Sequence, residues 1–114
     1  MRTRLIVMRH AKSSWSDANL DDFDRPLNKR GRRDSPRIAH ELHHRGWIPD
    51  RIRVSSSKRT IQTLELMEAI SNDAIVDVEP NLYHSGISTL LQIVEEIEDG
   101  KTTMVLSHNP GSEI

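Results

Sequence analysis

The chain has 114 residues, of which 35% are hydrophobic and 29% charged, and its formal net charge at pH 7 is −1. We expect one domain over residues 1–114, large enough for a hydrophobic core. The absence of cysteine excludes disulfides and thiolate catalysis, and the small net charge argues against nucleic acid or an acidic membrane as a partner. The N-terminus has no apolar segment long enough for a signal peptide or membrane span, so we expect a cytoplasmic protein.

The first predicted element is a strand. The apolar run Leu5–Met8 is typical of a strand buried on both faces of a parallel sheet, and it is followed directly by Arg9 and His10. A loop rich in Ser, Asp and Asn follows over residues 12–24. The strand therefore brings a cation and an imidazole to the C-terminal edge of the sheet, where open α/β folds bind ligands.

A helix is predicted after this loop. Asn28 is a candidate N-cap, and Gly46 is suited to the position just after the C-terminus. Pro36 leaves two alternatives, because it fits either the first turn of a helix opened by Asp34 or Ser35, or the inside of a helix that begins earlier.

Strands and helices alternate over the rest of the chain. We expect strands at residues 51–55, 75–79 and 102–106, the second of them at a sheet edge. The apolar spacing predicts one helix over residues 58–70 and another that Ser88 caps. This alternation is typical of an α/β fold with a mainly parallel sheet.

Residues that directly follow the strands collect at one edge of such a sheet. Two arginines and two histidines are expected there: Arg9, His10, Arg59 and His108. Arginine suits phosphate because its planar fork donates two parallel hydrogen bonds, and Arg59 would also lie in the first turn of a helix, where the dipole favours anions. A histidine with its unperturbed pKa of ~6.5 is largely neutral at cytoplasmic pH and can attack phosphorus. Such a site supports phosphoryl transfer, for which arginines can neutralise charge without a metal.

Five segments of the chain, in order, resemble the histidine phosphatase superfamily, and more closely the small SixA-type phosphohistidine phosphatases. The matching segments are residues 5–15, 24–31, 55–63, 82–84 and 107–111. The resemblance implies a three-layer α/β/α fold of the phosphoglycerate mutase-like kind. It also implies that the chain lacks the C-terminal portion of the family, because Ile114 follows soon after Gly111.

The resemblance implies roles for individual residues. His10 would be the nucleophile that is phosphorylated during turnover. Its phosphate pocket would be formed by Arg9, Arg59 and His108. Arg25 matches an arginine at the entrance of SixA-type sites, and Ser16 falls where mutase-like members carry a phosphate-binding asparagine.

The general acid of mutase-like members has no clear counterpart. Glu79 is the nearest candidate by position. Acidic residues of the early loop are alternatives: Asp17, Asp21, Asp22 and Asp24. Imidazole is a weaker base than an alkoxide, so it needs less protonation when it leaves phosphorus. A site without a well-placed general acid is therefore better suited to cleaving phosphohistidine than phosphate esters.

We therefore expect a metal-independent and cofactor-free phosphatase that removes phosphate from phosphohistidine in a signalling or carrier protein. One alternative is a phosphomonoesterase acting on a small phosphate ester. Another is a non-catalytic module that binds phosphoproteins, because the short C-terminus would leave one flank of the sheet uncovered and open to self-association.

A competing pattern lies in the first predicted helix. His40, Glu41 and His44 match the H-E-x-x-H signature of zinc proteases, in which the two histidines are one helical turn apart. The pattern is short, and no third ligand follows. We favour a solvated helix end, where basic residues also suit the helix dipole.

Overall fold

The computed structural model describes residues 3–9, 26–80, 82 and 87–107. Its strands form one parallel sheet with the order β1-β4-β2-β3. The strands are β1 (Arg4–Arg9), β2 (Arg51–Ser55), β3 (Ile75–Glu79) and β4 (Thr102–Ser107). The parallel sheet confirms the predicted fold class, and the expected strands at 51–55 and 75–79 have the predicted bounds, with β3 at an edge.

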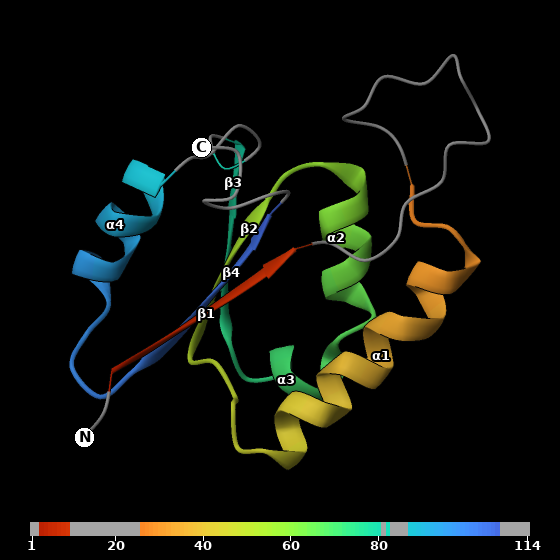
Figure 1. Cartoon of the computed structure of the whole chain (residues 1–114), viewed down its shortest axis with the longest axis horizontal. Coiled ribbons are helices and arrows are strands. Elements are labelled where there is room, and N and C mark those ends of the chain that lie inside the picture. Colours follow the sequence, from red (N-terminus) through yellow and green to blue (C-terminus); the bar gives the residue numbers. More distant parts are fainter. Residues whose placement is uncertain (1–2, 10–25, 81, 83–86, 108–114) are drawn as a thin grey trace.

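Helices cover the sheet on both faces (Figure 1). One face carries α1 (Lys29–His44), α2 (Lys58–Glu65) and α3 (Glu68–Ser71), and the other carries α4 (Ile87–Glu96). These are the three layers, α/β/α, that the sequence predicts. Among the described residues, no helix is both long and apolar enough to cross a membrane.

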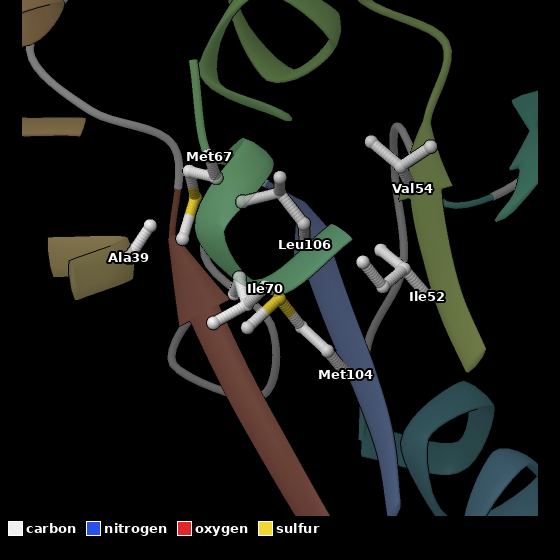
Figure 2. Packing of buried hydrophobic residues seen from close by; sticks show 7 residues of the cluster. All are labelled: Ala39, Ile52, Val54, Met67, Ile70, Met104 and Leu106. Atoms are coloured by element: carbon white, nitrogen blue, oxygen red, sulfur yellow. The ribbon is translucent and has the colours of Figure 1, made fainter. Parts of the chain in front are cut away.

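The larger part of the core lies between the sheet and the layer of α1 to α3 (Figure 2). Its buried members come from both sides of this interface: Ala39, Ile52, Val54, Met67, Ile70, Met104 and Leu106. A smaller cluster of Leu82, Ile93 and Val105 packs on the face that α4 covers. Successive side chains of a strand point to opposite faces. Met104 and Leu106 therefore pack in the larger cluster, and Val105 between them packs in the smaller one.

The two inner strands are β4 and β2, and we call β4 the central strand because it is the one that is buried throughout. Every residue of β4 is buried, whereas β1 lies at the end of the sheet order and pairs only with β4 among the described residues. Val7 is 44% exposed, so the expectation that the first strand is buried on both faces is wrong. An apolar run shows that a strand is hydrophobic, but its place in the sheet depends on which strands pair with it.

The start of α1 is the one predicted from Asn28. The side-chain oxygen of Asn28 accepts a hydrogen bond from the backbone N–H of Gly31 at 2.8 Å. Pro36 therefore lies inside a helix that begins earlier, which is the second of the two alternatives. Gly46 has a φ of +76°, a conformation that glycine adopts without steric cost, and it follows the helix end as expected.

The helix predicted over residues 58–70 is divided in two. Met67 has φ −108° and ψ 37°, outside the helical region, and it separates α2 from α3. After this interruption both Met67 and Ile70 are buried in the core. The spacing of apolar residues does not reveal such a break, because core packing rather than local propensity sets it. The last helix starts at Ile87, so Ser88 lies in its first turn and not at its cap.

We expect Asn28→Ala to lower the free energy of unfolding by about 1 kcal/mol, because it removes the acceptor for the Gly31 N–H at the start of α1. Urea denaturation measures the change. Asn72→Ala is the matched control, since Asn72 is exposed at the end of α3 and should change stability by less than about 0.5 kcal/mol. Equal losses in the two variants would contradict a capping role for Asn28.

Candidate functional site

Four polar residues end the four strands and lie side by side across the sheet. Arg9 pairs with Ser107 and Ser55 pairs with Glu79, and the pairing of Val54 with Leu106 places Ser55 beside Ser107. We call Arg9, Ser107, Ser55 and Glu79 the terminal row. It lies at the C-terminal edge of the sheet, where the sequence predicts a ligand site.

The terminal row belongs to the face of the sheet that α4 covers. Leu5 and Val105 pack in the smaller cluster on that face, and Arg9 and Ser107 share their parity along β1 and β4. Ser107 and Ser55 are both completely buried, whereas Arg9 is exposed. The row therefore combines a solvent-accessible cation with buried hydroxyl groups.

The turn between β2 and α2 is held by buried hydroxyl groups. The hydroxyl of Thr60 donates to the carbonyl of Ser55 at 2.7 Å and lies 2.8 Å from the Ser57 hydroxyl. The Ser57 hydroxyl thus contacts Thr60 and makes no capping bond to the helix backbone. These contacts fix the first turn of α2 close to the end of β2.

Arg59 lies in this first turn and is only 3% exposed. Its backbone carbonyl accepts a hydrogen bond from the Thr63 hydroxyl at 2.7 Å. A buried guanidinium at a helix N-terminus adds its charge to the positive end of the helix dipole, and both favour an anion. Arg9 reaches the same sheet edge from β1, and its side chain makes no hydrogen bond or ion pair to another described residue. The structure thus brings Arg9 and Arg59, two of the predicted site residues, to one edge.

Glu79 is held by Arg53. The two carboxylate oxygens accept hydrogen bonds from the guanidinium at 2.5 and 2.7 Å, and Arg53 also donates to Glu96 on α4 at 2.8 Å. The hydrogen bond to Glu79 raises the pKa of Arg53 above its usual range, against the effect of burial. Both carboxylate oxygens of Glu79 are therefore engaged by Arg53.

A cavity of about 840 Å³ lies on the same face, between α4 and the strands β2 and β3. Its lining includes Arg51, Arg53, Asp77 and Glu96. Arg51 is paired with Asp77, and Arg53 is paired with Glu96, so these four charges are neutralised within the lining. Of the terminal row, only Glu79 lines this cavity, and we do not assign the phosphate site to it.

Several predicted site residues lie outside the described residues: His10, Ser16, Arg25, His108 and the alternative acids Asp17, Asp21, Asp22 and Asp24. Their predicted roles stay predictions. Two features at or near the terminal row were not predicted, the Arg53 network and the buried Ser107. The alternation of Arg51 and Arg53 with Ile52 and Val54 was a usable signal for the first, because it places both arginines on one face of the sheet.

The H-E-x-x-H pattern lies on the exposed side of α1. His40, Glu41 and His44 are all exposed, and Glu41 accepts a hydrogen bond from Arg45 at 2.6 Å. Within the described part of the chain, no group of three His, Cys, Asp or Glu side chains is placed to hold a metal ion.

Comparisons with known proteins agree with the fold and with the motifs. Residues 5–85 match the model of the histidine phosphatase superfamily (branch 1). The chain belongs to this superfamily.

The similar proteins include SixA structures. A protein assigned as the phosphohistidine phosphatase SixA in Agrobacterium tumefaciens superposes with a TM-score of 0.85 at 29% identity, covering 99% of this chain and 73% of that one. A protein histidine phosphatase SixA complexed with tungstate gives a TM-score of 0.73 at 28% identity, covering 91% and 68%. An uncharacterized chloroplastic protein of Arabidopsis thaliana is 37% identical, and the match covers 96% of this chain but only 56% of the relative.

Replacing Arg53 by Met should lower the free energy of unfolding by about 2 kcal/mol, because it leaves the half-buried carboxylate of Glu79 without its partner and unties α4 from the sheet. Thermal and urea denaturation measure this effect. Arg51→Met is the matched control on the same strand, since Arg51 and Asp77 are 44% and 38% exposed and such pairs contribute about 0–1 kcal/mol. An Arg51 variant as unstable as the Arg53 variant would contradict this account.

Proposed function

We propose that this chain is a phosphatase that works through a phosphohistidine intermediate on His10. The observation that carries the proposal is the buried Arg59 in the first turn of α2, at the same sheet edge as Arg9. Membership of the histidine phosphatase superfamily supports a phosphate as the anion that these cations bind. The chain spans 56% of the length of its Arabidopsis relative.

The proposed reaction has two steps. The neutral imidazole of His10 attacks phosphorus, a bond from His10 nitrogen to phosphorus forms, and the bond from phosphorus to the leaving group breaks. Water then attacks the phosphorylated His10, releases inorganic phosphate and restores the imidazole. Arg9 and Arg59 neutralise the phosphoryl oxygens in both steps, and His108 donates a further hydrogen bond to them.

The proposed substrate class is phosphohistidine in a protein. Glu79 supports this choice because both of its carboxylate oxygens are already engaged by Arg53. The imidazole released from phosphohistidine needs less help from an acid than an alkoxide does. Similarity to SixA proteins, one of them named a protein histidine phosphatase and complexed with tungstate, points in the same direction.

Trapping tests the covalent step. Brief incubation of the full chain with phosphoramidate should place acid-labile phosphate on His10, detected by mass spectrometry under alkaline conditions. His10→Ala should take up no label while keeping the melting temperature of the wild type. If the wild type binds inorganic phosphate but takes up no label, the chain is a phosphate-binding module and the proposed activity is wrong.

The substrate class is tested by turnover. Phosphohistidine protein should be hydrolysed with a higher kcat/KM than phosphoserine peptides or sugar phosphates. Glu79→Gln should change kcat on phosphohistidine by less than about threefold, because the proposed reaction takes no proton from this residue. Equal or faster turnover of the phosphate esters would contradict the proposed specificity, and a loss of about 100-fold in the Glu79 variant would assign Glu79 as the acid.

A further inference from the structure

The side chain of Ser107 is in an unusual state for a buried polar group. Ser107 ends the central strand and is 0% exposed, and its hydroxyl oxygen has no hydrogen-bond partner. Buried hydroxyls elsewhere in the described structure are satisfied. Those of Ser35, Thr60 and Thr63 each donate to a backbone carbonyl at 2.7 Å.

An unpaired buried hydroxyl destabilises a protein, because the bonds that it made to water in the unfolded chain are not replaced. Alanine or valine at this position would avoid that cost in a strand whose neighbours, Val105 and Leu106, are fully buried and apolar. The serine is therefore explained best by a partner that is absent from the free protein and arrives with a ligand.

The neighbours of Ser107 indicate what that partner is. Its register partner across the sheet is Arg9, whose guanidinium also lacks a hydrogen bond or ion pair to any described residue. On the other side Ser55 already contacts the backbone N–H of Ser57, and Glu79 is engaged by Arg53. The unpaired hydroxyl of Ser107 and the exposed guanidinium of Arg9 are thus adjacent and belong to the same face. A hydroxyl beside a free cation suits an oxyanion, since the hydroxyl can donate to the oxygen that the guanidinium neutralises.

We propose that Ser107 is a binding residue of the phosphate site, donating its hydroxyl hydrogen to an oxygen of the bound phosphoryl group beside Arg9. This inference rests on the proposed function in one respect, that the anion at this sheet edge is a phosphoryl group. It adds a ligand contact from the central strand to those of Arg9 and Arg59. The hydroxyl then exchanges an unpaired state in the free protein for a charge-assisted hydrogen bond in the complex.

The proposal separates stability from binding, and two measurements on the full chain test it. Ser107→Ala should leave the melting temperature of the unliganded protein unchanged or higher, because the hydroxyl that it removes has no partner. The same variant should bind tungstate and inorganic phosphate about tenfold more weakly by calorimetry, since a hydrogen bond to a charged group is lost.

Ser107→Thr keeps a hydroxyl and should bind tungstate more tightly than Ser107→Ala. If threonine is too large for the site, Ser107→Cys provides a near-isosteric weak donor, and its affinity should resemble that of the alanine variant.

Ser35→Ala is the matched control. Ser35 is equally buried, and its hydroxyl donates to the Gly31 carbonyl within α1. This variant should have a lower melting temperature and an unchanged affinity for tungstate, the reverse of the pattern expected for Ser107→Ala.

The outcomes also separate this inference from the proposed function. Wild-type affinity for tungstate in Ser107→Ala overturns the role of Ser107, even if phosphatase turnover is intact. A lower melting temperature with unchanged affinity also overturns it, since the hydroxyl would then be structural. If the wild type binds tungstate but shows no turnover, and Ser107→Ala weakens binding, the role of Ser107 is supported and the proposed activity fails. A wild type that binds neither anion overturns both.

Discussion

The structure depends most on the complete burial of β4. This strand lies between β1 and β2 and carries core side chains on both faces, so Met104 and Leu106 pack under α1 to α3 while Val105 packs under α4. Burial of this kind removes all water from the strand, so its backbone groups must pair with the two neighbouring strands. The parallel pairing that satisfies them also aligns the C-terminal ends of the strands.

This alignment explains how a small apolar sheet can build a polar site. A parallel sheet places the last residue of every strand at one edge, and here each of these last residues is polar or charged. The core below the terminal row excludes water, and the edge above it is where an anion can be held. Arg59 extends the site from the first turn of α2, where Thr60 and Ser57 hold the turn against β2. The positive charge of Arg59 thus starts from a turn that buried hydrogen bonds hold.

The charges on the α4 side have a different role. Arg53 on β2 forms ion pairs with Glu79 on β3 and Glu96 on α4, and so connects these three elements. These pairs lie next to the C-terminal edge of the sheet. Arg53 engages both carboxylate oxygens of Glu79, the last residue of β3. The network that fastens α4 to the sheet therefore also holds the end of β3 in place.

The sequence by itself determined the local features of this protein. Periodicity located β2 and β3 at their observed bounds, Asn28 and Gly46 marked the ends of α1, and the motifs led to a superfamily that the comparisons confirm. These features depend on neighbours within a few residues, or on patterns that persist along the chain. Of the candidate site, Arg9 and Arg59 could be placed at one edge from the sequence, because each follows the end of a predicted strand.

Only the tertiary structure decided the position of β1 at the end of the described sheet, the break at Met67, the engagement of Glu79 by Arg53 and the unpaired hydroxyl of Ser107. Each of these depends on contacts between segments that are distant in sequence. Ser107 illustrates the difference, since a serine after an apolar strand is unremarkable in the sequence. Its meaning comes from complete burial and from a register that sets it beside Arg9, and both are properties of the packed sheet.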